Sequence, residues 1–187
     1  MSYKTAVIIT DQDVQPEEFS YPLYRLIEEG FVVDLWLTGA VTATDKSGTG
    51  LATLFSKSNQ GRIITDVAQV IDYDVTIIPG GFAPERVRLN QGVLYYLRHC
   101  DKHQRIIGAI CHGPQVLMSA GVLKDKNSTC FIGVKDDLIN AGGKYAGPGV
   151  YVDGNLVTAD HYRENPMWMK KTLELYDKYT LAHYVGM

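Results

Sequence analysis

Short runs of apolar, β-branched residues alternate along this chain with segments of helical periodicity. The run TAVIIT, residues 5–10, is typical of a buried strand. Residues 17–30 then place Phe19, Leu23 and Leu26 on one helical face and end in glycine. A chain that repeats this strand and helix pair has few folds open to it, because each strand needs parallel neighbours and each helix must cover the sheet.

The alternation continues to the C-terminus. We expect irregular loops with short strands over 39–61. Further helices are expected at 66–72, 89–103, 112–121, 136–141 and 165–184. Further strands are expected at 31–37, 74–81, 105–110 and near 127–132, with a hairpin over 150–159. The predicted class is α/β, a flavodoxin-like three-layer sandwich whose mostly parallel sheet has helices on both faces.

Composition bounds the class of protein. The 187 residues, 45% of them hydrophobic, suit a single domain over residues 1–187. Eighteen basic and twenty-one acidic side chains give a net charge of -3 without a basic run, so we expect no nucleic-acid partner. The apolar run near the N-terminus is too short for a signal peptide or a membrane span, which favours a cytoplasmic protein with no membrane partner.

The three cysteines, Cys100, Cys111 and Cys130, have no C-x-x-C spacing, which indicates free thiols in a reducing compartment. His99, Cys100 and His103 lie together on one expected helix, but no second cluster completes a metal site. We therefore predict no metal and no cofactor.

Ligands of open parallel sheets bind at the carboxyl ends of the strands, and Cys111 lies at such an end. It follows the strand 105–110 in GAICHGP and precedes a helix with proline in its first turn. A tight strand-to-helix turn would lift the sulfur out of the sheet, and the helix N-terminus would lower the thiol pKa. The alternative is a small buried packing residue.

Two other strand ends carry candidate residues. Gly80 and Gly81 end a strand in IIPGG, where backbone N–H groups could approach a ligand as an oxyanion hole, although Pro-Gly-Gly also makes ordinary turns. Glu17 and Glu18 open the first helix. A carboxyl group held near the cysteine would have a raised pKa, whereas the alternative is a surface charge that compensates the helix dipole.

A cysteine and histidine pair needs a third group to orient the imidazole. His112 follows Cys111 directly, and Glu85 is a candidate for the third group, or it forms a surface ion pair with Arg86 or Arg88. His161 follows the last expected strand and either lines the same site or lies on a surface loop.

Four segments together give the chain a resemblance to the ThiJ/PfpI family, the intracellular protease I-like members of the class I glutamine amidotransferase-like superfamily. The likeness covers nearly the whole chain, and its specific parts follow the family's order: IIPGGFAPERVRLN (77–90), GAICHGPQVLMSAGVLK (108–124), GVKDDLINAGGKY (133–145) and VYVDGNLVTA (150–159).

The resemblance implies a nucleophile elbow with unfavourable dihedral angles at Cys111, and a contact between its sulfur and Glu18, four residues before Pro22. It further implies that Glu85 of a neighbouring subunit completes a triad with His112, so that the protein is a homo-oligomer, a dimer or a hexamer. Gly80, Gly81, Gly113, Phe131 and His161 are the expected oxyanion and substrate-binding residues.

This chain departs from the family pattern at two places. Phe131 and Ile132 stand where relatives commonly have an aromatic hydroxyl and a proline, and Thr158-Ala159-Asp160 replaces a Thr-Ser-Arg sequence. We expect a cysteine-dependent hydrolase or lyase that acts on the carbonyl group of a peptide or of a small reactive aldehyde, as a peptidase or a glyoxalase or deglycase. The alternative is a redox-sensing or chaperone-like stress protein in which Cys111 is oxidised.

Overall fold

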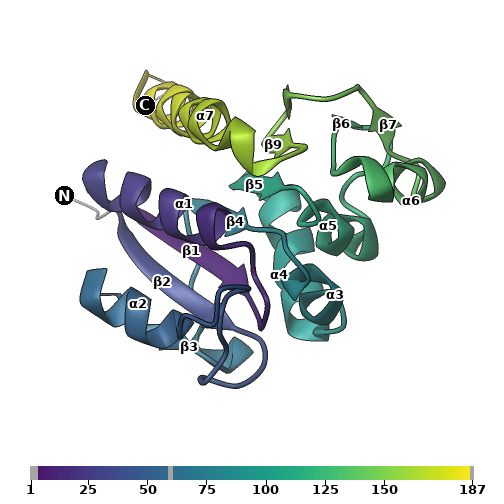
Figure 1. The fold of residues 1–187 in the computed structure, drawn as a ribbon. Coiled ribbons are helices and arrows are strands. Elements are labelled where there is room, and N and C mark those ends of the chain that lie inside the picture. The colour runs from purple at the N-terminus through teal and green to yellow at the C-terminus, as the bar shows by residue number, and fades with distance from the viewer. Residues whose placement is uncertain (1–3, 59–60, 186–187) are drawn as a thin grey trace.

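A computed structural model describes residues 4–58 and 61–185, and its centre is a seven-stranded sheet (Figure 1). The strands lie in the order β3-β2-β1-β4-β5-β9-β8, and only β8 runs antiparallel to its neighbour. Their bounds are β1 Thr5–Thr10, β2 Val32–Leu37, β3 Ile63–Ile64, β4 Val75–Ile78, β5 Ile106–Ile110, β8 Val150–Asp153 and β9 Leu156–Ala159. The predicted mostly parallel sheet is confirmed.

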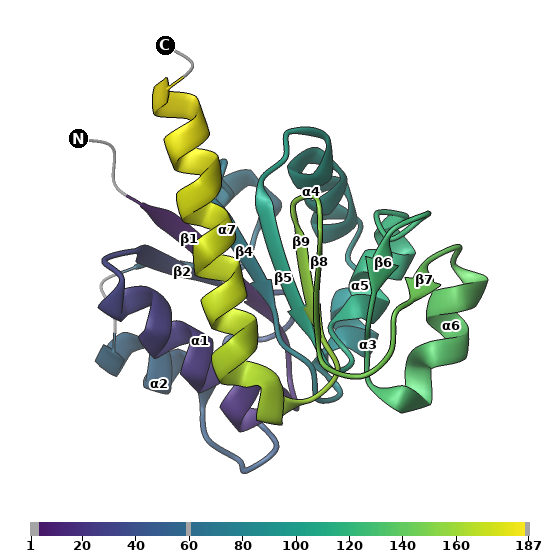
Figure 2. The ribbon, with the colours of Figure 1, turned by 90° about the horizontal axis from the view of Figure 1, so that it is seen from above.

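Helices cover both faces of this sheet (Figure 2). One face is covered by α1 (Pro16–Glu28), α2 (Leu51–Ser58) and α7 (Asn165–Val185), and the other by α3 (Ala83–Val87), α4 (Gln91–Lys102), α5 (Pro114–Ala120) and α6 (Lys135–Asn140). Within the described residues, no helix is both long and apolar enough to cross a membrane.

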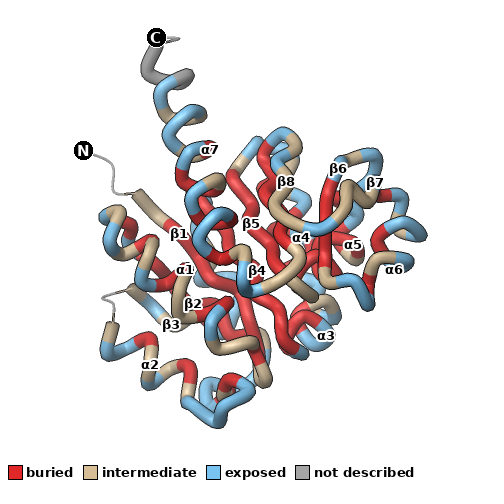
Figure 3. The backbone as a smooth tube through the Cα atoms, turned by 45° about the horizontal axis from the view of Figure 1, so that its top comes forward, coloured by how far each residue is buried: buried red, intermediate tan, exposed pale blue. Residues whose placement is uncertain are grey.

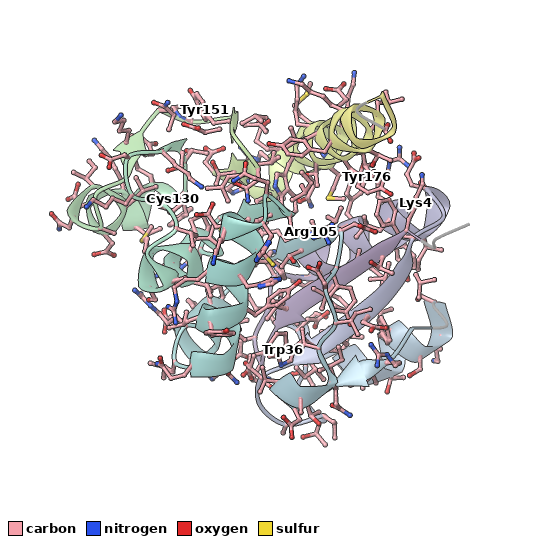
Figure 4. All side chains as sticks on the ribbon, turned by 180° about the vertical axis from the view of Figure 1, so that it is seen from behind. Lys4, Trp36, Arg105, Cys130, Tyr151 and Tyr176 are labelled. Atoms are coloured by element: carbon pink, nitrogen blue, oxygen red, sulfur yellow. The ribbon has the colours of Figure 1, made fainter. Side chains whose placement is uncertain are left out.

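The buried residues form two apolar clusters, one on each side of the sheet, and the central strands are buried along nearly their whole length (Figure 3). Trp36 on β2 belongs to the cluster beneath α4 and α5, where its ring meets that of Tyr96 edge-on with centroids 5.8 Å apart (Figure 4). Burial on both faces explains why the strands read as continuous apolar runs rather than as alternating ones.

The register brings several chain segments to one end of the sheet. Ile8 of β1 is aligned with Ile77 of β4, Ile77 with Gly108 of β5, and Ile110 with Ala159 of β9. Because these strands are parallel, the loops that follow β1, β4, β5 and β9 meet at their shared carboxyl end.

Four elements differ from the expectations. The segment 39–61, expected to be irregular, contains α2, and α3 was not expected at all. The strand expected near 127–132 is only β6 (Asn127–Ser128), which pairs with β7 (Lys144–Tyr145) in a separate two-stranded sheet. The helix expected at 66–72 is a 3-10 turn at Val67–Gln69.

Candidate active site

Cys111 lies in a left-handed turn directly after β5, with φ of 58°. Its N–H donates to the carbonyl of Ala159 at 2.9 Å, and its own carbonyl accepts from the N–H of Phe131 at 2.9 Å. Non-glycine residues rarely adopt this conformation, so backbone contacts on both sides must hold it. The unfavourable dihedral angle predicted for a nucleophile elbow is confirmed.

Glu18 projects from the first turn of α1 into the interior and is fully buried. Its Oε2 accepts a hydrogen bond from the N–H of Gly80 at 2.8 Å. Burial raises the pKa of this carboxyl to about 7, although the bond from Gly80 and the Cys111 thiol both lower it. Oε1 has no hydrogen-bond partner of good geometry among the described residues, so a proton on Glu18 would be available to a nearby acceptor.

Gly80 and Gly81 are packed too closely for a side chain. A Cβ on Gly80 would lie 2.6 Å from Glu18 Oε2 and 2.8 Å from the Cβ of Cys111. Gly81 has φ of 74°, and a Cβ there would lie 2.4 Å from the backbone nitrogen of Gln15. These two glycines let β4 end against both the acid and the thiol.

The expected oxyanion hole needs a correction at two residues. The N–H of Gly80 is taken by Glu18, and the N–H of Gly113 donates to the carbonyl of Ile110 at 2.7 Å. The backbone N–H groups of Gly81 and His112 act on the Cys111 thiol instead and lower its pKa. These two amides are therefore the donors that could meet a negatively charged oxygen beside the sulfur.

The thiol pKa differs from the sequence-based expectation. Burial and the nearby Glu18 charge raise the pKa of Cys111 to about 12, and the amides of Gly81 and His112 lower it only in part. The prediction of a lowered pKa was wrong because desolvation of the buried sulfur and the Glu18 charge outweigh the two amides. A thiolate therefore forms only with the help of a proton acceptor.

His112 is half-buried and stacks on Phe131, with ring centroids 5.0 Å apart and planes 26° apart. Burial lowers the pKa of the imidazole, the charge of Glu85 raises it, and Lys46 lowers it. Its Nδ1 is buried with no hydrogen-bond partner in the part of the chain that the structure describes. Buried polar atoms are rarely left unpaired, so this nitrogen is open to a partner that the described residues do not supply.

Glu85 is exposed on α3, and neither neighbouring arginine pairs with it. Arg86 forms an ion pair with Asp13 at 3.2 Å, and Arg88 donates to Ser119 Oγ at 2.9 Å. The alternative ion pairs considered for Glu85 are therefore not formed, and its carboxylate is free of bonds to the described residues. Its charge acts on His112 without a hydrogen bond between them.

His161 remains outside this group of residues. Its Nδ1 accepts from the N–H of Arg163 at 3.3 Å, and its ring packs on Tyr162. No hydrogen bond joins it to Cys111 or His112 in the described segments, so the surface-turn alternative fits this residue better.

Lys46 was missed by the sequence reasoning. It lies in the loop between β2 and α2, yet its charge reaches both Glu18 and His112 and lowers the pKa of each. A lone lysine in a polar loop has no motif to mark it, because its proximity to the site arises only from the tertiary fold.

A separate hollow of about 360 Å³ lies near the start of β1 and β2, away from Cys111. Its polar side chains satisfy one another: Arg62 pairs with Asp34 at 2.7 Å, and the Tyr73 hydroxyl donates to Asp34. This arrangement stabilises the edge of the sheet and leaves none of these three groups to bind a ligand.

The fold and the site together define a flavodoxin-like α/β protein with a cysteine at the turn that follows its β5 strand. The chain belongs to the DJ-1/PfpI family, whose model matches residues 4–175. The resemblance seen in the sequence is thereby confirmed.

Similar proteins include the deglycase PfpI of Pyrococcus furiosus, 35% identical over 169 residues that cover 90% of this chain and 97% of that protein. YraA of Bacillus subtilis, which carries a provisional cysteine-protease name, is 35% identical over 160 residues, covering 85% of this chain and 89% of that protein. Both likenesses extend over most of each chain.

Solved structures agree on the fold. Drosophila melanogaster DJ-1beta is 26% identical with a TM-score of 0.75, covering 94% of this chain and 91% of that one. A ThiJ/PfpI domain protein from Brachyspira murdochii has a TM-score of 0.82 at 16% identity, covering 95% and 99% of the two chains. The predicted flavodoxin-like class is confirmed.

Proposed function

We propose that this protein is a cysteine-dependent enzyme that acts on the carbonyl group of a small reactive aldehyde, of an aldehyde adduct or of a peptide. The observation that carries the proposal is the left-handed turn at Cys111, which places its sulfur beside two amides and a buried carboxyl group. The names of the relatives, a deglycase and a provisional cysteine protease, agree with carbonyl chemistry.

The first step rests on the closeness of Glu18 to the Cys111 thiol. Glu18, whose pKa is about 7, is ionised in a large fraction of molecules near neutral pH and can accept the thiol proton of Cys111. The sulfur then forms a bond to the carbonyl carbon, and the carbonyl electron pair moves onto oxygen. The N–H groups of Gly81 and His112 stabilise that oxygen, and the protonated Glu18 donates to an acceptor in the site.

The second step differs between aldehyde and amide substrates. With an aldehyde the adduct is a hemithioacetal, and proton transfer between adjacent carbons followed by attack of water would convert methylglyoxal to lactate. With an amide the amine leaves with a proton and water hydrolyses the thioester. His112 is the group placed to carry these protons, because burial keeps its imidazole neutral.

We further propose that the site is completed by a second copy of the chain. Nδ1 of His112 is buried and unpartnered within the described residues, while Glu85 is exposed and unpaired there. The Glu85 carboxylate of a neighbouring subunit would accept a hydrogen bond from the Nδ1–H of His112 and orient the ring. This bond would give both the buried nitrogen and the unpaired carboxylate a partner.

The test is an assay of purified protein with methylglyoxal, with the methylglyoxal adduct of an N-acetylated amino acid, and with a fluorogenic aminopeptide. Cys111→Ser is expected to remove turnover, whereas the control Cys100→Ala, which changes a buried cysteine of α4, should retain it. Turnover that survives in Cys111→Ser would overturn the proposal.

The redox-sensing alternative rests on one observation: Cys111 is partly exposed, whereas Cys100 and Cys130 are buried. Graded peroxide followed by peptide mass analysis tests it. Oxidation of Cys111 to sulfinic acid before the other two cysteines, without turnover of any carbonyl substrate, would favour this alternative. Earlier oxidation of Cys100 or Cys130 would exclude it.

A further inference from the structure

The backbone at Lys46 is fixed beside the site by a short three-stranded contact. Val14 pairs with Asp45 on one side and with Gly81 on the other, and the N–H of Lys46 donates to the Val14 carbonyl at 3.0 Å. Asp45 is buried, and its carboxylate accepts from the N–H of Ser47 at 2.8 Å. Residue 46 is thus tied to the same backbone contact that carries the oxyanion donor.

The side chain of Lys46 extends over an exposed aromatic ring. Its Nζ lies 4.8 Å from the ring centroid of Phe82, which directly follows Gly81 and is half exposed. A cation over an aromatic face is weakly held, but the contact defines where the ammonium group lies. No carboxylate of the described residues forms an ion pair with it.

The unpaired positive charge of Lys46 acts on two groups of the candidate site. The positive charge lowers the pKa of Glu18 on α1 and of His112 after β5. Glu85 acts on His112 in the opposite direction, but it forms no ion pair with Lys46. The ammonium group of Lys46 can therefore pair with an anion, because neither Glu18 nor Glu85 forms an ion pair with it.

We propose that Lys46 recognises an anionic group and selects α-oxoaldehydes that carry a carboxylate farther along the molecule over uncharged ones such as methylglyoxal. The proposal deepens the proposed function and rests on it for the reaction at Cys111. The substrate carboxylate would lose bound water and pair with the Lys46 ammonium group that lies over the Phe82 ring. The carbonyl oxygen of the substrate would then lie toward the amides of Gly81 and His112. Lys46 acts on binding, and the bond-forming steps at the sulfur are unchanged.

Alkylation of Cys111 measures this selectivity without any turnover. Iodoacetate and iodoacetamide transfer groups of nearly the same size to a thiol, and only iodoacetate is negatively charged. We expect Lys46→Gln to lower the ratio of the iodoacetate rate to the iodoacetamide rate at Cys111 by about fivefold at low salt, from a charge contact in water. Changes in thiol pKa affect both reagents and cancel in the ratio.

Two variants and salt serve as controls. Lys46→Arg should keep the wild-type ratio, and Lys57→Gln, which removes an exposed lysine in the last turn of α2, should also keep it. Salt should lower the ratio in the wild type and leave it unchanged in Lys46→Gln. An equal ratio in the wild type and Lys46→Gln, or an equal fall in Lys57→Gln, would overturn the inference.

Turnover separates this inference from the proposed function. The ratio of kcat/KM for 4,5-dioxopentanoate, an α-oxoaldehyde with a terminal carboxylate, to kcat/KM for methylglyoxal should fall in Lys46→Gln through KM for 4,5-dioxopentanoate. If the wild type turns over neither aldehyde nor the peptide, the proposed function fails, and the alkylation ratio still decides whether Lys46 recognises anions. If both aldehydes react and their ratio does not change in Lys46→Gln, the selectivity fails and the proposed function stands.

Discussion

Glu18 is the residue whose protonation links the site to stability. Its pKa rises from 4.5 to about 7 on folding, so the folded chain holds this proton more tightly than the unfolded chain. The resulting stabilisation is fully present below about pH 4.5 and is lost as the pH rises through 7. Such a shift corresponds to a free-energy change on the order of 3 kcal/mol.

The measurement is urea unfolding of the wild type and of Glu18→Gln between pH 4.5 and 8. The free energy of unfolding of the wild type should fall relative to that of Glu18→Gln over this range, because glutamine has no proton to lose. Asp136→Asn, which changes an exposed carboxylate on α6, should retain the wild-type dependence. A constant difference between the wild type and Glu18→Gln would contradict the raised pKa.

Gly80 gives a second prediction for a single residue. In Gly80→Ala the methyl group would meet Glu18 Oε2 and Cys111 Cβ, so the backbone must move at the contact between the acid and the thiol. We expect about 1–3 kcal/mol of lost stability and a changed alkylation rate at Cys111.

Gly121→Ala is the control for that substitution. Gly121 has φ of 76° with nothing within 4 Å of an added Cβ, so this variant has backbone strain alone. Gly121→Ala should lower the free energy of unfolding by roughly 1–2 kcal/mol and leave the alkylation rate of Cys111 unchanged. Equal alkylation rates in Gly80→Ala and the wild type would show that the close packing at Gly80 has no effect on the thiol.

For single residues, sequence reasoning located the site better than it described its electrostatics. Cys111, Gly81 and the pair Glu17 and Glu18 were candidates because strand ends of a parallel sheet converge, and the family resemblance then singled out Glu18. The direction of the Cys111 pKa shift was wrong because burial depends on contacts with residues far away in the chain. Lys46 escaped notice for the same reason.

At the scale of elements, α7 is attached to the sheet chiefly through Trp168. This side chain is fully buried, its Nε1–H donates to the Val157 carbonyl at 3.1 Å, and its ring lies against Gly108. Trp168→Ala should lower the free energy of unfolding by about 3–5 kcal/mol, whereas Met167→Ala at the exposed neighbour should have little effect. Thermal or urea unfolding measures both, and similar losses in the two variants would contradict this account of α7.

The elements that sequence reasoning missed are short. α2 buries only Leu51 and Phe55 and follows Gly48 and Gly50, so its helical periodicity has too few residues to stand out. The segment near β6 has a strand-like pattern, but only two of its residues pair with β7. Long, doubly buried strands such as β1 and β5 were predicted well because burial on both faces leaves a continuous apolar run.

For the whole molecule, the incomplete surroundings of His112 predict a homo-oligomer. Sedimentation of the purified protein should show at least a dimer, and Glu85→Gln should reduce turnover that depends on His112. Asp177→Asn, which removes an exposed carboxylate on α7, is the matched control and should leave both properties unchanged. A strictly monomeric species with full activity would exclude a site shared between subunits.

The hydrogen bond between the N–H of Cys111 and the carbonyl of Ala159 has a consequence for biosynthesis. Ala159 ends β9, one of the last strands of the chain to be translated, so the turn at Cys111 lacks this contact while the nascent chain is growing. Until β9 has been translated, the edge of β5 that pairs with β9 has no partner strand. The reactive geometry of the thiol therefore arises only when translation is nearly complete, and unfinished chains carry an ordinary cysteine.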